Sequence, residues 1–172
     1  MSRPPVALTI AGSDPSGGAG IQADLKTFSA LGVYGTSVVT ALTAQNTRGV
    51  TGVHVVPTEF VTQQLETLVA DVRLDAIKIG MLANAGIVGA VAEFLQSHDL
   101  VDCVVLDPVM VATSSDRLLD DDAVQSLRAL MPLASLIPPN LAEAAALPHT
   151  PPARPLPTPR THPKRQTSPV AP

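Results

Sequence analysis

Short apolar runs alternate with longer segments of helical periodicity over most of the chain. Residues 6–11 form a mostly apolar run, which predicts a strand covered on both faces of a parallel sheet. Ile21, Leu25 and Phe28 recur further on at the spacing of one helix face. The segment between them is rich in glycine, at positions 12, 17, 18 and 20. A strand, a glycine-rich loop and a helix are therefore expected at the start of the chain.

The same alternation continues through residue 146. Further strands are expected at residues 35–42, 75–81, 103–110 and 134–137. Helices are expected to begin near residues 58, 84, 120 and 140, with Asn84 as an N-cap. Residues 48–56 are expected to form a small hairpin or flap. Strands that alternate with helical segments predict an α/β domain with a mainly parallel sheet.

Polar side chains gather where the expected strands end. In parallel α/β sheets, ligands bind outside the carboxyl ends of the strands. Residues 43–47 form one polar cluster of this kind, at the end of the second expected strand. The polar residues expected at this edge of the sheet are Ser13, Asp14, Gln45, Asn46, Asp107, Asn140 and Glu143. Their convergence from distant parts of the chain predicts a binding site.

Composition narrows the class of protein. The 172 residues are 45% hydrophobic and only 2% aromatic, and the formal net charge is −4. Acidic balance and scarce aromatic side chains argue against a nucleic-acid partner. The single Cys103 excludes an internal disulfide and a cysteine metal cage, and we expect it to be buried and inert. With no signal-peptide pattern and no membrane-length apolar run, we expect a soluble cytoplasmic protein without a membrane partner.

The composition changes abruptly near residue 147. Residues 147–172 contain nine prolines and four basic residues, whereas all 15 acidic residues precede them. Such a segment has few groups to bury and cannot form helix interiors or central strands. We therefore expect one folded domain over residues 1–146 and a disordered, polyproline-rich basic tail over residues 147–172.

Two charged residues stand at positions expected to face the core. Asp24 shares the helix stripe of Ile21 and Phe28, where a carboxylate is costly unless a polar group meets it. The alternative is a partly solvated Asp in the first turn that complements the helix dipole. Lys78 lies inside an expected strand, where it either extends to an edge or meets a buried acid. We assign Lys78 no catalytic role.

The glycine spacing limits the chemistry of the first loop. The loop lacks the Gly-Lys-Ser/Thr ending of a Walker A motif and the Gly-x-Gly-x-x-Gly pattern of nicotinamide enzymes. Its position before a helix still suits an anion or a small polar ligand. A site for Mg²⁺ or phosphate is indicated by three residues with oxygen-bearing side chains, Asp107, Asn140 and Glu143. The alternatives are a strand-end turn for Asp107 and a helix cap for Asn140 with Glu143.

Four segments carry a resemblance to a known family. Residues 6–28 contain Ala-Gly-Ser-Asp-Pro-Ser-Gly-Gly-Ala-Gly, and the other segments are residues 39–50, 77–81 and 105–110. Together they resemble the hydroxymethylpyrimidine/phosphomethylpyrimidine kinases of thiamine biosynthesis, which are ribokinase-like. The resemblance covers about residues 5–146 and implies helices on both faces of the sheet. It also implies that the fold is incomplete at its C-terminal side.

The resemblance implies a reaction and a set of site residues. ATP, with Mg²⁺, would phosphorylate 4-amino-5-hydroxymethyl-2-methylpyrimidine and then its monophosphate. Asp24 and Gln45 would hydrogen-bond the aminopyrimidine edge. The ring would be walled by Gly12, Ala19, Met81 and Val109. Asp107 and Glu143 would hold the metal, with Asn140 on the phosphate side, and the protein would be a homodimer.

The sequence also departs from the family pattern. Thr43 stands where family members usually have Val, which makes one pocket wall more polar. The Gly-Thr-Gly-Cys segment that activates the acceptor hydroxyl is absent, so no catalytic residue is assigned. A frameshift or mis-called end near residue 147 is our hypothesis for this difference. A non-catalytic pyrimidine-binding module, an inactive fragment and a pyridoxal-type vitamin kinase are the alternative functions.

Overall fold

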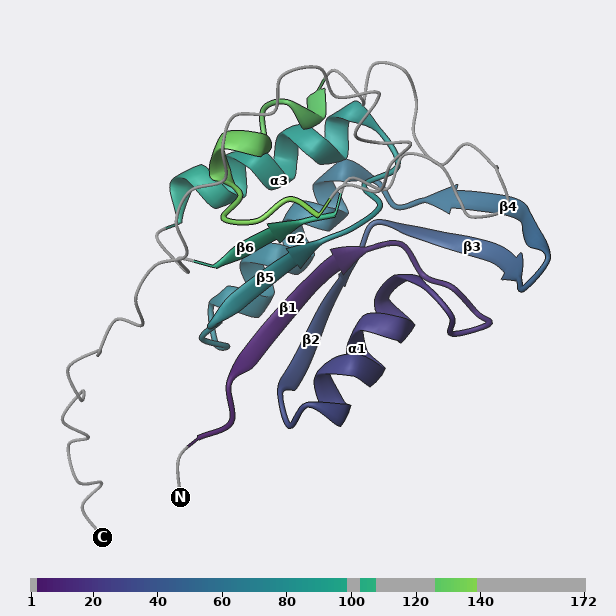
Figure 1. Ribbon diagram of the computed structural model, residues 1–172. Helices are drawn as coiled ribbons and strands as arrows, with labels where there is room; N and C mark the ends of the chain where they lie inside the picture. The colour runs from purple at the N-terminus through teal and green to yellow at the C-terminus, as the bar shows by residue number, and fades with distance from the viewer. Residues whose placement is uncertain (1–2, 99–102, 108–125, 139–172) are drawn as a thin grey trace, which may run out of the picture.

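A four-stranded parallel sheet forms the centre of the protein (Figure 1). The computed structural model describes residues 3–98, 103–107 and 126–138. In the sheet order β2-β1-β5-β6, the strands are Tyr34–Val39, Val6–Ala11, Ala76–Ile79 and Val104–Leu106. The predicted mainly parallel α/β sheet is therefore confirmed. The boundary expected at residue 147 lies outside the described residues.

Helices cover both faces of this sheet (Figure 1). They are α1 (Gly20–Ala30), α2 (Thr58–Val69), α3 (Ala85–Ser97) and the short 3-10 helix η1 (Met131–Leu133). Helix α1 lies on one face, and α2 and α3 lie together on the other. Asn84 caps α3 as predicted, because its side chain accepts a hydrogen bond from the Ile87 N–H. Among the described residues, no helix is long and apolar enough to cross a membrane.

Strand β1 packs against helices on both faces of the sheet. All six of its residues are buried, as expected for a central parallel strand. Leu8 and Ile10 belong to the main apolar core, which also contains Leu65 of α2 and Ile87 of α3. Thr9 points to the opposite face, where its hydroxyl contacts α1. The period of two along a strand thus gives α1 a polar contact with the sheet and leaves the aliphatic core to α2 and α3.

A two-stranded antiparallel hairpin projects beyond the carboxyl edge of the sheet (Figure 1). Its strands are β3 (Ala41–Asn46) and β4 (Gly49–Val55). The prediction of a single strand over residues 35–42 is wrong, as is a hairpin confined to residues 48–56. Strand β2 loses its partner after Val39, which pairs with Ala11, the last residue of β1. The next strand, β3, pairs with β4 instead, so the polar cluster at residues 43–47 falls largely within a strand.

Other sequence expectations also need correction. Strand β6 has three residues instead of the eight predicted over residues 103–110, of which residues 108–110 lie outside the described residues. The strand expected at residues 134–137 is reduced to a bridge between Val105 and Leu136. Cys103 is partly exposed and not buried. The apolar stripe of α1 is only half-buried. The helices expected near residues 120 and 140 begin outside the described residues.

Candidate functional site

The connections that follow β1 and β5 leave the carboxyl edge of the sheet in opposite directions. These neighbouring strands lead into helices on opposite faces, α1 after β1 and α3 after β5. Loops that leave in opposite directions open a space between adjacent strand ends, which is the usual ligand position in such folds. Gly12 directly follows β1, and Gly80 and Met81 directly follow β5. The predicted binding edge therefore coincides with the switch point of the topology.

Asp14 organises the glycine-rich loop. Its side chain is buried, with only 2% of the residue exposed, and accepts N–H hydrogen bonds from Ser16 (2.9 Å), Gly18 (3.0 Å) and Ala19 (2.9 Å). The Ser16 hydroxyl donates to the same carboxylate at 2.8 Å. Burial alone would raise the pKa of Asp14. The Ser16 hydroxyl and the three backbone donors outweigh burial and hold that pKa below its usual value.

The contacts of Asp14 change the interpretation of the loop. Three N–H groups that an external phosphate could use are already engaged by the chain's own carboxylate. The expectation that this loop suits an external anion is therefore not supported at these three donors. The loop is therefore closed on its own carboxylate.

Gly20 allows α1 to begin directly against the end of β1. Its φ of +57° lies in the left-handed region, and a Cβ at this position would collide with the carbonyl oxygen of Gly12. The Ile21 N–H donates to that same carbonyl at 3.0 Å. The Gln22 side-chain oxygen accepts the Asp14 N–H at 2.8 Å. These contacts fix the register of α1 on the sheet and therefore the position of Asp24.

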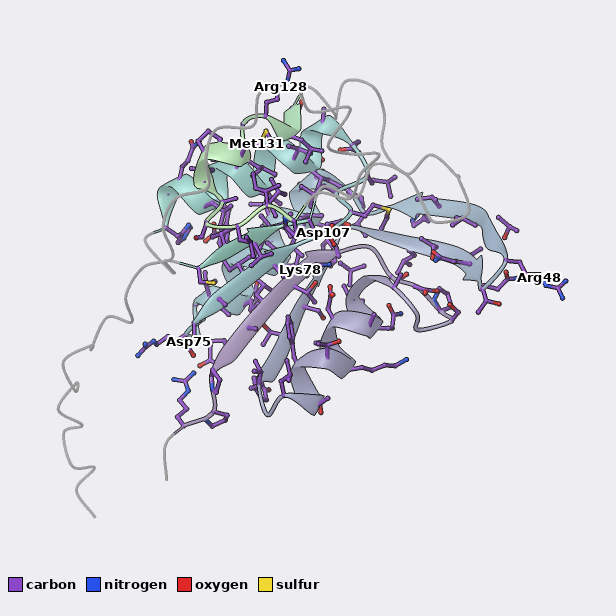
Figure 2. All side chains as sticks on the ribbon, in the orientation of Figure 1. Arg48, Asp75, Lys78, Asp107, Arg128 and Met131 are labelled. Carbon is purple, nitrogen blue, oxygen red and sulfur yellow. The ribbon has the colours of Figure 1, made fainter. Side chains whose placement is uncertain are left out.

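A row of polar and charged side chains crosses the sheet beneath α1. Thr9 of β1 donates its hydroxyl proton to Asp24 Oδ2 at 2.6 Å. Lys78 of β5 donates from Nζ to the same oxygen at 3.1 Å, and its Nζ lies 3.6 Å from Asp107 Oδ2. Lys78 and Asp107 lie together near the carboxyl edge, whereas Asp75 lies at the opposite end of the sheet (Figure 2). The row joins a residue predicted to bind substrate with one predicted to bind metal.

These contacts decide between the two interpretations of Asp24. No acidic residue lies in the first turn of α1, so the interpretation as a solvated first-turn Asp is wrong. The side chain is only 17% exposed and meets two polar partners, as the other interpretation requires. The contact between Lys78 and Asp24 confirms the alternative in which Lys78 meets an acid, although Lys78 was not among the predicted site residues. Its signal was a lone cation inside an apolar strand.

Thr43 connects the hairpin to the glycine-rich loop. Its hydroxyl donates to the Ser13 carbonyl at 2.8 Å, and its N–H donates to Ser13 Oγ at 3.1 Å. The same hydroxyl lies 3.2 Å from the Gln45 side-chain oxygen. The Ser13 N–H donates in turn to the Ala41 carbonyl at 2.9 Å. The polar residue that departs from the family pattern therefore links the loop with Gln45.

Met81 forms the apolar part of this edge. It is buried with Ala41 and Ala83 in a small cluster separate from the main core. Its backbone carbonyl accepts the Thr40 hydroxyl at 2.6 Å. A Cβ on Gly12 would meet the Met81 methyl group, so these two predicted wall residues lie against each other.

The remaining predicted site residues are described only in part. Val109, Asn140 and Glu143 lie outside the described residues. Ala19 begins α1 as its N-cap, with an exposed side chain. The Asp107 side chain is 36% exposed at the end of β6. Over residues 3–98, 103–107 and 126–138, no three His, Cys, Asp or Glu side chains form a group that could hold a metal ion.

Comparison with protein families shows which proteins this chain is similar to. The family model described as phosphomethylpyrimidine kinase matches residues 14–158. The hydroxymethylpyrimidine/phosphomethylpyrimidine kinase of Escherichia coli strain K12 is 62% identical over 149 residues. That alignment covers 86% of this chain and 56% of the E. coli protein. The chain thus spans about half the length of the curated relatives it matches.

Solved structures agree with the sequence match. The phosphomethylpyrimidine kinase of Clostridium difficile 630 superposes with a TM-score of 0.77 at 47% identity, covering 83% of this chain and 62% of that one. The pyridoxal kinase of Bacillus subtilis, solved as an ADP complex, gives a TM-score of 0.72 at 40% identity and covers 83% and 53%. These neighbours confirm the predicted ribokinase-like fold. The chain belongs to the phosphomethylpyrimidine kinase family.

Proposed function

We propose that this protein phosphorylates 4-amino-5-hydroxymethyl-2-methylpyrimidine, and then its monophosphate, with ATP in thiamine biosynthesis. Family membership supports the reaction class. The observation that carries the proposal for this chain is the row of Thr9, Asp24, Lys78 and Asp107 at the switch point. It provides a hydrogen-bonding carboxylate on one side and an oxygen ligand for a cation on the other.

We propose that the pocket binds the pyrimidine by its polar edge and its flat faces. Asp24 and Gln45 would hydrogen-bond the aminopyrimidine edge. The walls would be Gly12, Ala19, Met81 and Val109. Gly12 and Met81 lie against each other, so the two residues could form one continuous wall against a face of the ring.

We propose Asp107 and Glu143 as Mg²⁺ ligands, with Asn140 beside the phosphates. Mg²⁺ commonly takes one or two protein carboxylates and completes its shell with water and substrate phosphates. The partly exposed Asp107 carboxylate fits that requirement at the end of β6. Bound Mg²⁺ would neutralise charge on the phosphates of ATP. The protein's own contribution at these residues is positioning and charge balance.

Phosphorus NMR of a mixture of protein, ATP, Mg²⁺ and the hydroxymethylpyrimidine tests this proposal. We expect a phosphomonoester signal and ADP that form only when the pyrimidine is present. The Asp24→Asn variant should show a higher KM for the pyrimidine. Pyrimidine-independent ATP hydrolysis alone would contradict the proposal.

Three alternatives predict different results. A pyridoxal-type kinase is supported by the fold similarity to the B. subtilis enzyme, and it predicts turnover of pyridoxal but not of the hydroxymethylpyrimidine. A non-catalytic pyrimidine-binding module predicts that the pyrimidine raises the melting temperature while no ADP forms. An inactive fragment predicts neither effect.

We extend the proposal to a homodimer, which the family resemblance implies. The hairpin exposes the apolar side chains of Leu42, Val53 and Val55. Leu42 lies on the face opposite to Val53 and Val55, because it pairs with His54 whereas Val53 pairs with Thr43. A second copy that covers the Leu42 face would remove this apolar side chain from water. Light scattering after size-exclusion chromatography should give a dimer mass that Leu42→Asp lowers. A monomer mass at every concentration would contradict this extension.

A further inference from the structure

We propose that Lys78 is a positioning residue that selects which oxygen of Asp24 faces the ligand and thereby sets the preference for an amino-substituted ring. This inference rests on the proposed function, because it concerns the specificity of the same pocket. It begins from two donors that converge on one atom. Thr9 Oγ1 lies 2.6 Å and Lys78 Nζ 3.1 Å from Asp24 Oδ2. Among the described residues, no side chain is seen to donate to Asp24 Oδ1.

The sheet holds both donors rigidly. Thr9 and Lys78 are directly opposite each other in the register of β1 and β5. Residues opposite each other on adjacent strands project to the same face, which here is the face covered by α1. Thr9 is fully buried, and Lys78 is only 23% exposed. Donors fixed on two central strands constrain a carboxylate more strictly than donors on loops would.

The Lys78 ammonium group lies between the carboxylates of Asp24 and Asp107. Its Nζ is 3.1 Å from Asp24 Oδ2 and 3.6 Å from Asp107 Oδ2. Gly80 leaves this space open, because a Cβ there would lie 3.1 Å from Nζ. An ammonium group has three donors, so Lys78 can serve both carboxylates at once. It therefore balances charge on the substrate side and on the metal side of the site.

The saturated Oδ2 has a consequence for recognition. A carboxylate with one oxygen occupied by two donors offers its other oxygen as an acceptor. Only a ligand edge with a hydrogen-bond donor can meet that oxygen. The exocyclic amino group of the pyrimidine is such a donor, whereas a carbonyl at the same ring position would place two acceptors together. The mismatch leaves buried polar groups unpaired, which is how a polar pocket rejects close analogues.

Calorimetric titration of two ligands into matched variants tests the inference. The ligands are 4-amino-5-hydroxymethyl-2-methylpyrimidine and its 4-oxo analogue, and the variants are Lys78→Met, Lys78→Arg and Thr9→Val. Hydrogen bonds to a charged group imply that Lys78→Met weakens binding of the amino ligand about 10- to 100-fold. Binding of the oxo analogue should change about twofold or less, so discrimination falls. Lys78→Arg should restore most of the discrimination, since it keeps the charge and the donors.

The variants separate positioning from mere stability. Arg73→Met is the control for loss of a basic side chain, because Arg73 is exposed and pairs with Asp75 away from the row. Thr9→Val removes the second donor without changing charge, and it serves where Lys78→Met fails to fold. Equal discrimination in the unaltered chain, Lys78→Met and Thr9→Val would overturn this inference alone. Failure of the unaltered chain to bind the amino ligand would overturn the proposed function and this inference together.

Discussion

Asp14 and Asp24 show how two carboxylates of one loop–helix unit take different roles. The chain's own N–H groups surround Asp14, whereas Asp24 has one oxygen held by Thr9 and Lys78. A carboxylate whose acceptors are filled by backbone donors is structural. A carboxylate that keeps one oxygen available as an acceptor at the binding edge can bind a ligand. At the scale of single residues, hydrogen-bond partners therefore decide function more than residue type does.

Asp14→Asn should reduce stability and flatten its dependence on pH. The folded-state pKa of Asp14 lies below the ordinary value of 3.8, so the folded state binds fewer protons than the unfolded state in mildly acidic solution. The contribution of Asp14 is present above about pH 4 and is lost as the pH falls through the folded-state pKa. At pH 7 we expect a loss of about 1–3 kcal/mol in the free energy of unfolding.

Urea unfolding at a series of pH values measures this effect. The variant should lose much less stability than the unaltered chain does as the pH falls from 6 toward 3. Asp71→Asn is the control, since Asp71 is exposed beyond the end of α2. Parallel pH profiles for the unaltered chain and Asp14→Asn would show that the loop does not depend on an ionised Asp14.

Gly20→Ala should be among the most destabilising changes in the described chain. Alanine at a positive φ costs about 1–2 kcal/mol, and here its Cβ would also collide with the Gly12 carbonyl. Gly32→Ala is a matched control, because Gly32 has a φ of +71° but open space around its Cα. Thermal unfolding should show a clearly larger loss for Gly20→Ala. Equal losses would mean that the close approach of α1 to β1 is unimportant.

At the scale of elements, the hairpin of β3 and β4 depends on the loop at its base. Three hydrogen bonds join Ser13 of the loop to β3. Two come from Thr43, and the third runs from the Ser13 N–H to the Ala41 carbonyl. Backbone and side-chain bonds of this kind hold the hairpin over the carboxyl edge. The position of Gln45 is therefore set by contacts at the base of the hairpin.

Thr43→Val tests this connection, because valine keeps the shape and removes the hydroxyl. The Ser13 carbonyl loses its donor, at about 1 kcal/mol for one hydrogen bond. Hydrogen–deuterium exchange should become about fivefold faster for the amides at positions 13 and 43 and remain unchanged in β1 and β5.

Thr51→Val provides the comparison within the same hairpin. Its hydroxyl donates to the Ala44 carbonyl, but the side chain is exposed. We expect no change in exchange at position 13 in this variant. Equal effects of the two substitutions would indicate a general loss of hairpin stability and not a specific connection to the loop.

At the scale of the whole molecule, the hydrophobic and polar pattern predicts the features that depend on residues close together in the chain. The buried strand before Gly12 and the cap at Asn84 depend on neighbouring residues, and both were predicted. The hairpin was misplaced because its start depends on where β1 ends, which is a long-range property. Asp24 and Lys78 were both noticed as charges at core-facing positions, but their pairing depends on the register between α1 and β5.

At the site, the family resemblance predicts more residues than the hydrophobic and polar pattern does. It selected Asp24, Gln45, Gly12 and Met81 from separate segments, and the structure brings Gly12 against Met81 and ties Gln45 through Thr43 to the first loop. Their roles toward a ligand stay predictions. Side-chain partners such as Thr9 could not be inferred, because a threonine in a strand has no pattern that marks it as a ligand-positioning group.

Calorimetric titration of 4-amino-5-hydroxymethyl-2-methylpyrimidine into the unaltered chain and Asp24→Asn, without nucleotide, tests whether Asp24 binds the pyrimidine. We predict binding at one site per chain. Asp24→Asn should weaken it about 10- to 100-fold because a charged acceptor is lost, and Asp71→Asn should leave it unchanged. No binding heat and no rise in melting temperature for the unaltered chain, or equal affinity for Asp24→Asn, would contradict it.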